Sequence, residues 1–429
     1  MFLALGGAPD ERGFWPVLLA ALALGLALAK DRRAFSDIAV GGMSQPIVLL
    51  MVMAWMLAGV LGKVVQASGF VIALAELAHG LGVTGGGFTA AAFLIACVIS
   101  TATGTSLGTL IVTTPLLHPA GTDLGSDPVV LLGALVGGAV FGDNISPVSD
   151  TTIASAATQD AGMGQVVKSR LRYALPAAAI ALVLYTVFGG GYETAVASTE
   201  SLQGGNSRAL AMLVAPALVI FLLLRRRHLI EGLMAGIGAA VVIGLGLRLV
   251  DPSTLLYVDP ERFSARGLII EGIEKSIGTV VFTFFLMGII ATFEASGLLG
   301  TFLERWSPKE SVPATEGWIF GVTSVAALAT THSSVVILAL GDMVREAGER
   351  VGIDRYRRSN LLDVTVCTYP FLLPYCIPTI LAASLTAEPV RVTALQAGLH
   401  NFHSWALLGV IVFAIVTGYG RAREGNNES

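Results

Sequence analysis

The residues that determine the architecture are Phe141-Gly142-Asp143-Asn144-Ile145-Ser146-Pro147-Val148-Ser149-Asp150-Thr151-Thr152. They place two carboxylates, one amide and four hydroxyls around a proline, between apolar flanks at 129–141 and 151–157. Each flank is too short to cross a bilayer alone, because a crossing needs about 20 apolar residues. Irregular backbone at membrane depth is tolerated only inside protein or along a cavity. The stretch therefore predicts a helix that is broken inside the membrane.

The alternative for this stretch is an ordinary loop outside the membrane. Asp150 would then cap a helix that begins at Thr151, since aspartate is a favoured N-cap residue. Inside the membrane, a charged carboxylate costs about 2.5 to 3.5 kcal/mol on insertion scales. Two carboxylates so close together therefore predict a bound cation, a proton, or both.

The composition predicts a multi-pass membrane protein that contacts lipid. Of the 429 residues, 54% are hydrophobic and 13% are charged, whereas soluble domains carry roughly 25% charged residues. The mean hydropathy is +0.76. These values argue against a soluble enzyme, a nucleic-acid-binding protein and a disordered scaffold. The fold class that we predict is all-α.

The apolar stretches are of two kinds. The uninterrupted ones predict simple crossings at 14–30, 45–64, 171–189, 208–224, 229–249, 276–295 and 404–420. The others are interrupted by Gly, Pro, Ser and Thr, and lie at 86–118 (broken at 101–106), 128–160 (broken at 142–150), 316–345 (broken at 330–334) and 359–388 (broken at 369–378).

The basic residues predict which side of the membrane each loop faces. Short loops rich in Lys and Arg stay in the cytoplasm, and the basic clusters lie at 30–33, 168–172, 225–227, 345–358 and 421–423. The connection at 119–127 has two aspartates and no base. Both facts are satisfied if 86–118 is a re-entrant hairpin from outside and 316–345 a re-entrant hairpin from inside. The other two broken stretches then cross fully, and the C-terminus is cytoplasmic.

This threading contains an inverted repeat of about five elements in each half. Each half reads span, span, hairpin, broken span, span. We predict a first repeat over 1–190, a linker loop with a linking helix over 191–227, and a second repeat over 228–429. Inverted repeats whose broken helices meet near the midplane are typical of secondary transporters. No Walker-type phosphate loop occurs, so ATP-driven transport has no support.

The first half supplies the predicted ion site. Asp143 and Asp150 are the candidate ligands of Na⁺ and carriers of the proton, because hard alkali cations take oxygen ligands from carboxylates and unwound backbone. The same stretch adds Asn144, Ser146, Ser149, Thr151 and Thr152. The tip of the first hairpin adds Thr105 and Ser106, although such tips also occur because small residues pack closely.

The second half offers different chemistry. Its hairpin tip carries His332, Ser333 and Ser334. The histidine either relays protons or donates to a substrate carboxylate, or packs against a carbonyl. The broken span at 369–378 has three prolines and two tyrosines, of which Tyr369 is a candidate substrate contact. Asp363 either lies in a cytoplasmic access path or starts its helix.

Two motifs give the chain a family resemblance. GTSLGT at 104–109 and FGDNISPVSDTT at 141–152 resemble the paired signatures of the NhaC family of sodium/proton antiporters, within the ion transporter superfamily. The resemblance covers most of the chain in layout and is motif-specific over about 100–160. It implies an elevator-type carrier, a homodimer, that couples transport to Na⁺ and H⁺. The matching positions are Thr105, Ser106, Asp143, Ser146, Asp150 and Thr151.

Three positions depart from the family pattern. Leu107 stands where typical members have tryptophan, Asn144 where they have lysine, and Ile153 where they have asparagine. The missing lysine removes a built-in countercharge beside the acidic motif. Relatives that exchange organic acids or amino acids share the same signatures.

The leading hypothesis is therefore a sodium/proton antiporter of the cell's inner (plasma) membrane, with no cofactor beyond the ions. The alternative is a sodium- or proton-coupled transporter or exchanger of a small organic solute, an amino acid or an organic acid. A channel needs no inverted pair of broken helices. An intramembrane hydrolase would need a nucleophile and a base, and neighbours such as His332 and Ser333 seldom align for that task. We therefore predict that the chain is not an enzyme.

Overall fold

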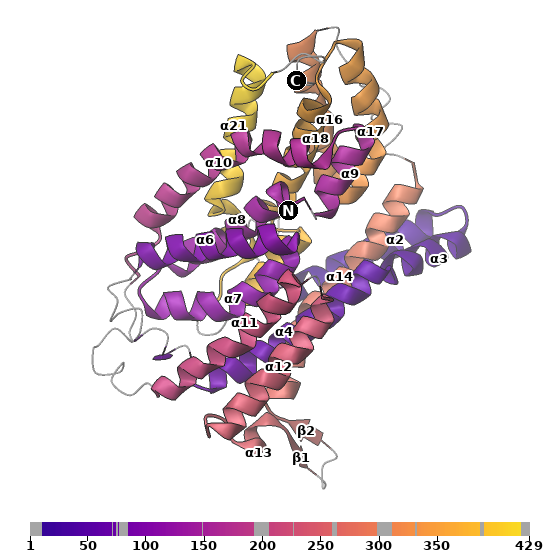
Figure 1. Cartoon of the computed structure of the whole chain (residues 1–429). Helices are drawn as coiled ribbons and strands as arrows, with labels where there is room; N and C mark the ends of the chain where they lie inside the picture. The colour runs from indigo at the N-terminus through magenta and orange to yellow at the C-terminus, as the bar shows by residue number, and fades with distance from the viewer. Residues whose placement is uncertain are drawn as a thin grey trace.

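The computed structural model describes residues 11–70, 72, 73, 76, 85–147, 149–192, 206–225, 227–259, 264–297, 311–330, 333–386 and 390–421. These ranges are mostly helical, as Figure 1 shows, which confirms the helical fold class. The strands in them are β1 (Tyr257–Asp259) and β2 (Ser264–Arg266), which form a short antiparallel pair that the sequence did not predict.

Most of the helices follow the predicted stretches. The first part contains η1 (Glu11–Phe14), α2 (Trp15–Leu28), α3 (Arg32–Met43), α4 (Pro46–Ala67), α6 (Gly86–Thr103), α7 (Ser106–Asp123), α8 (Pro128–Ile145), α9 (Asp150–Thr158) and α10 (Met163–Phe188). The middle contains η2 (Ser207–Leu213), α11 (Val214–Leu224), α12 (Leu229–Gly246), α13 (Pro252–Leu255) and α14 (Leu268–Ala295). The last part contains α16 (Val312–Thr330), α17 (Ser333–Arg350), α18 (Arg355–Thr368), η3 (Tyr369–Phe371), α19 (Ile377–Ser384), α20 (Ala394–Leu399) and α21 (Phe402–Thr417).

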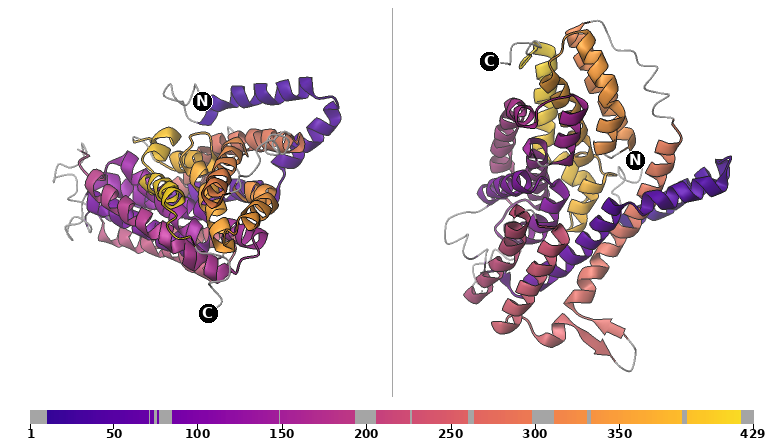
Figure 2. Two further views of the ribbon diagram at one scale, coloured as in Figure 1. Left: turned by 90° about the horizontal axis from the view of Figure 1, so that it is seen from above. Right: turned by 45° about the vertical axis from the view of Figure 1, so that its right-hand side comes forward.

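Seven helical stretches of the described residues are long and apolar enough to cross a membrane. They are Val48–Ala67, Gly86–Thr103, Pro128–Thr158, Met163–Phe188, Leu229–Gly246, Leu268–Phe293 and Val312–Thr330. The chain is thus a multi-pass membrane protein. Figure 2 shows the first helices at the margin of the bundle, and α2 has no buried residue.

Three helices differ from the predicted boundaries. α10 begins at Met163 rather than at 171, and α14 begins at Leu268 rather than at 276. The sequence prediction left their N-terminal residues, which include Lys168 in α10 and Glu271 in α14, outside the crossings. α3 lies where the sequence predicted a loop, and it begins directly after Asp31. The Asp31 side chain accepts hydrogen bonds from the backbone N–H groups of Arg33 and Ala34. The positions of charged residues therefore did not predict where these helices start.

α6 and α7 form a helical pair that turns at Gly104. This glycine has a φ of 68°, a left-handed conformation that glycine adopts without a steric penalty. At the other end, the Gly85 N–H donates to the Leu124 carbonyl at 3.0 Å. The start of α6 therefore lies close to the end of α7.

α8 packs against the end of α6 at a glycine. A Cβ at Gly142 would lie 2.2 Å from the Thr101 backbone nitrogen, so no larger residue fits there without movement. One turn earlier, the Ser100 hydroxyl donates to the Ala139 carbonyl at 2.6 Å. This close approach brings the tip of the first helical pair to the acidic end of α8.

A buried ionic cluster ties together α16, α18 and the segment after α21. Glu316 accepts from Arg357 through Nε at 3.0 Å and Nη2 at 3.1 Å, and from Arg421 through Nη2 at 2.8 Å. The Glu316 and Arg357 side chains are 0% and 2% exposed. The sequence prediction placed Arg357 in a cytoplasmic loop, whereas the structure buries it because Glu316 and nearby carbonyl groups neutralise and solvate its charge.

We expect Glu316→Gln to lower the free energy of unfolding by about 3 to 5 kcal/mol, since it leaves two guanidinium groups without their carboxylate. Glu346→Gln removes the partner of Arg350 in a pair in which both side chains are about two-thirds exposed. That control should cost about 1 kcal/mol or less. Thermal unfolding of the purified protein in detergent measures both, and equal stability of the two variants would contradict the structural role of the cluster.

Candidate ion-binding site

The predicted break in the acidic stretch is present between α8 and α9. α8 ends at Ile145 with the Ser146 N–H donating to the Gly142 carbonyl at 2.8 Å, and α9 begins at Asp150. The 18-residue apolar window within Pro128–Thr158 is 83% buried, the highest share among the windows of the seven candidate spans in the described residues. At the break itself, Ser146 and Ser149 are buried, whereas Pro147 and Asp150 are exposed.

Asp143 lies at the centre of the site. Its side chain is buried and accepts two hydroxyl hydrogen bonds, from Ser106 at 2.9 Å and from Ser149 at 2.7 Å. Ser106 opens α7 at the tip of the first helical pair, and Ser149 precedes α9. The carboxylate thus joins three elements that are separate in the sequence.

Thr105 has a supporting position beside this contact. Its side chain caps α7 by accepting the Gly108 N–H at 3.2 Å. Its carbonyl accepts from the Thr109 hydroxyl at 2.8 Å. Thr105 therefore fixes the first turn of the helix that carries Ser106.

Asp150 lies at the edge of the same break, and it is exposed. It accepts a hydrogen bond from Ser334, in the first turn of α17. From Asp143, a chain of hydroxyl groups runs through Ser149 to Thr151, whose oxygens lie 3.0 Å apart. Asp150 separately connects the start of α9 to the first turn of α17.

A second buried charge cluster lies behind the break. Asp363 of α18 forms a direct ion pair with Arg170 of α10, and both side chains are 0% exposed. Asp363 also accepts from Ser155 at 2.9 Å. Arg170 donates in addition to the Asn144 carbonyl at 2.6 Å and to Thr152 at 2.9 Å.

Arg170 was missing from the predicted site. The sequence prediction assigned it to a cytoplasmic basic loop, because arginine at a span end usually stays in water. The signal that could have placed it is the absence of Gly and Pro between Gln165 and Arg170, which lets α10 continue past the charge. Its guanidinium satisfies a carbonyl that the end of α8 leaves without a helical partner.

Three further residues complete the centre. Asn144 and Ser146 are buried, and the Asn144 Oδ1 has no hydrogen-bond partner within the described part of the chain. Cys367 of α18 lies with its Sγ 3.0 Å from the Asp363 carboxylate and 3.3 Å from the Thr151 hydroxyl. A buried amide oxygen with no donor is the kind of group that a hard cation accepts as a ligand.

The remaining predicted residues lie farther out or outside the described residues. Ser333 lies 3.5 Å from the Val366 carbonyl, at the limit of a hydrogen bond. Tyr369 begins η3, and its carbonyl accepts the N–H groups of Leu372 and Leu373. His332 falls outside the described residues, so its predicted role stays a prediction.

Residues 17–190 match the sequence profile of the Na⁺/H⁺ antiporter family. This segment contains both sequence motifs, and it contains Asp143 together with Ser106 and Ser149, which donate hydrogen bonds to it. This part of the chain is similar to the members of that family.

Characterised relatives agree with the resemblance predicted from the sequence. The Na⁺/H⁺ antiporter NhaC of Alkalihalophilus pseudofirmus is 29% identical over 36% of this chain and 35% of that protein. The malate-2H⁺/Na⁺-lactate antiporter of Bacillus subtilis is 31% identical over 37% of each chain. The match thus spans about a third of each of these two relatives. The NhaC antiporter of Bacillus subtilis is 26% identical over 81% of this chain and 79% of that protein.

We expect Arg170→Gln to destabilise the protein by about 3 to 5 kcal/mol, because it leaves Asp363 buried without its countercharge. The double variant Arg170→Gln/Asp363→Asn should recover much of that loss, since it removes both charges. Lys168→Gln, an exposed cation two residues away on α10, should leave stability unchanged. Thermal unfolding in detergent measures all three, and a double variant less stable than the single variant would contradict the pairing.

Proposed function

We propose that this protein is a sodium/proton antiporter in which Asp143 binds Na⁺ and H⁺ in turn. One observation carries the proposal: a buried carboxylate, in the last turn of a helix beside its break, accepts hydrogen bonds from hydroxyl groups of two other segments. A carboxylate in such a place requires a neutralising partner. Na⁺ and H⁺ both neutralise it, and they compete because the same charge attracts both.

The hydroxyl groups around Asp143 suit this exchange. The hydroxyl groups of Ser106 and Ser149 donate hydrogen bonds to the carboxylate. A hydroxyl also has two acceptor lone pairs, so the same oxygens can rotate to face a cation. Asn144 Oδ1 is a further neutral oxygen donor close by in sequence. Small rotations of the two serines and the amide would therefore let the site hold either a proton or Na⁺.

The two other carboxylates have different proposed roles. Asp150 is exposed and contacts Ser334 of the second half, so we assign it to the mouth of the site, where it attracts Na⁺. Asp363 is neutralised by Arg170, so we assign it a fixed structural charge. The sequence predicted Asp143 and Asp150 together as ligands of Na⁺. We now propose that Asp143 is the ligand and that Asp150 is the carboxylate at the entrance.

We further infer the inverted-repeat arrangement over 1–190 and 228–429, with the α6–α7 and α16–α17 pairs re-entering the membrane from opposite sides. The Gly85 to Leu124 hydrogen bond supports the first of these hairpins. The basic loops support a cytoplasmic C-terminus. A homodimer in the plasma membrane is the assembly that we propose.

A second candidate function is exchange of a small organic solute with Na⁺ or H⁺. It is favoured by the Bacillus subtilis relative whose name describes malate-2H⁺/Na⁺-lactate antiport. In this candidate the Asp143 site binds the coupling ion, and the solute binds elsewhere in the chain.

We expect Asp143→Asn to reduce Na⁺-driven proton movement to the level of empty vesicles, since asparagine carries neither the charge nor the proton. The measurement is a pH-sensitive dye inside proteoliposomes after a Na⁺ pulse. Asp342→Asn is the matched control, because Asp342 is exposed on α17 and pairs with Arg345. Exchange that survives Asp143→Asn would refute the assignment of Asp143.

The same assay separates the two candidate functions. A sodium/proton antiporter should change the internal pH on a Na⁺ pulse alone, in a buffer without organic anions or amino acids. An exchanger of organic solutes should stay silent until a solute is present on one side. A response that strictly requires a solute would therefore reject simple sodium/proton antiport.

A further inference from the structure

A chain of hydroxyl and thiol groups leads from the ion site to the buried ion pair behind it. Asp143 accepts a hydrogen bond from Ser149 at 2.7 Å, and the Ser149 oxygen lies 3.0 Å from the Thr151 oxygen. The Cys367 sulfur lies 3.3 Å from the Thr151 oxygen and 3.0 Å from the Asp363 carboxylate. All five residues are buried. The chain thus joins the carboxylate at which we propose cation exchange to the carboxylate of the ion pair.

The number of protons fixes the direction of the hydrogen bonds in this chain. A hydroxyl group has one proton to donate and two lone pairs that accept. Ser149 donates its proton to Asp143, so its oxygen accepts from Thr151. Thr151 has then used its own proton, and its oxygen is left to accept from the Cys367 thiol. While Asp143 is ionised, the donors of this chain can therefore all point towards it.

The Cys367 thiol has one proton and two acceptors within reach. One acceptor is the neutral Thr151 oxygen, which leads to Asp143, and the other is the Asp363 carboxylate. Arg170 already compensates the charge of Asp363. Hydrogen bonds in a chain inside protein polarise one another, so an ionised group at the end strengthens every bond that points towards it. The thiol proton therefore turns towards Thr151 while Asp143 is ionised and holds no cation.

We propose that Cys367 is a positioning residue that lets this chain reverse when Na⁺ binds to Asp143, an inference that rests on the proposed function. Na⁺ takes a lone pair of the Ser149 oxygen, and the Ser149 proton turns to Thr151. The Thr151 proton turns to the Cys367 sulfur, and the thiol proton turns to Asp363. No covalent bond breaks, since each group only rotates about its C–O or C–S bond. Every buried donor of the chain thus keeps an acceptor in both states, because the carboxylate of the ion pair receives the last proton.

Calorimetric titration of the purified full-length protein with NaCl tests this role, at alkaline pH so that few protons compete. Cys367→Ala should weaken Na⁺ binding by about fivefold or more, because the Thr151 proton then has no acceptor in the sodium-bound state. Cys367→Ser should stay within about twofold of the native affinity, since a hydroxyl group also donates once and accepts. Thr151→Val should lose as much as Cys367→Ala, and the double variant should lose no more than either single variant.

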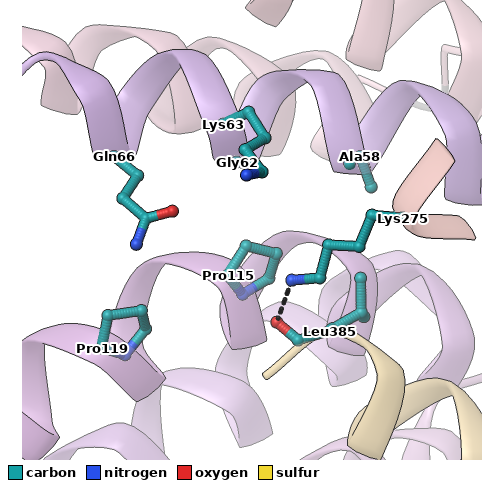
Figure 3. Close-up of a pocket in the computed structure, with 9 residues that line it drawn as sticks. Ala58, Gly62, Lys63, Gln66, Pro115, Pro119, Lys275 and Leu385 are labelled. Atoms are coloured by element: carbon teal, nitrogen blue, oxygen red, sulfur yellow. Dashed lines mark hydrogen bonds between the residues drawn. The ribbon is translucent and has the colours of Figure 1, made fainter. Parts of the chain in front are cut away.

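Two controls separate this role from a general perturbation of the fold. Cys97→Ala shortens another buried side chain, in an apolar cluster that includes Phe93 of α6, and should leave Na⁺ affinity unchanged. Gln66 points from α4 towards Pro119, near the end of α7 opposite to Ser106 (Figure 3), so Gln66→Ala should also have no effect. Thermal unfolding in sodium-free buffer shows whether each variant is folded.

Infrared difference spectroscopy observes the thiol directly in the native protein. The S–H stretching band lies apart from the other protein bands, and a stronger hydrogen bond lowers its frequency. A hydrogen bond to an ionised acceptor is stronger than one to a neutral acceptor. Addition of Na⁺, with choline as the reference cation, should therefore lower the frequency of one S–H band. The shift should be absent in Cys367→Ser and present in Cys97→Ala.

The outcomes distinguish this proposal from the one on which it rests. If the native protein binds no Na⁺, or binds it no better than Asp143→Asn does, the ion-site assignment fails and this proposal fails with it. If Na⁺ binding requires Asp143 but is equal in Cys367→Ala and Cys97→Ala, only the role of Cys367 is refuted. An S–H spectrum that does not change with Na⁺ also refutes it, and this measurement decides the question if Cys367→Ala does not fold.

Discussion

A carboxylate held away from water must be compensated, and this constraint organises the first half of the molecule. Asp143 lies where α8 stops, and the two hydroxyls that donate to it come from the helix-pair tip and from the break. Gly142 lets the α6 backbone approach closely enough for that tip to arrive. The broken helix, the turn between α6 and α7 and the glycine contact therefore together hold this one buried carboxylate.

The second buried acid is compensated in a different way. Asp363 is held by Arg170, which also bonds the Asn144 carbonyl at the end of α8 and Thr152 on α9. A covalently attached cation cannot leave, so this pair fixes α8, α9, α10 and α18 with respect to one another. In the described part of the chain, the hydrogen bonds to Asp143 come from the neutral hydroxyl groups of Ser106 and Ser149. The permanent ion pair is thus separate from the site at which we propose cation exchange.

Hydrophobic length and the polar interruptions predicted much of this arrangement. The break within 142–150 and the turn within 101–106 follow from small and polar residues inside apolar stretches, whereas the hydrogen bond from Ser106 to Asp143 was not predicted. The buried arginines did not follow, because the sequence alone cannot reveal that Arg170 has Asp363 as a partner 193 positions later. Charge near a span end was interpreted as a loop, whereas a distant carboxylate makes burial possible.

The sequence also did not predict that Asp150 is exposed. Asp143 and Asp150 share one motif and one chemistry, yet one is buried under two serines and the other meets Ser334 of the second half. Their difference arises from packing between elements that are remote in the chain.

The most direct test is the number of protons released when Na⁺ binds to the purified protein. Calorimetric titration with NaCl, in buffers of different ionisation enthalpy, gives that number without any transport assay. We predict proton release coupled to Na⁺ binding in the native chain, strongest at acidic pH where the carboxylate holds its proton, and neither binding nor release in Asp143→Asn. Sodium binding without proton release at every pH, or unchanged binding in Asp143→Asn, would contradict competition at this carboxylate.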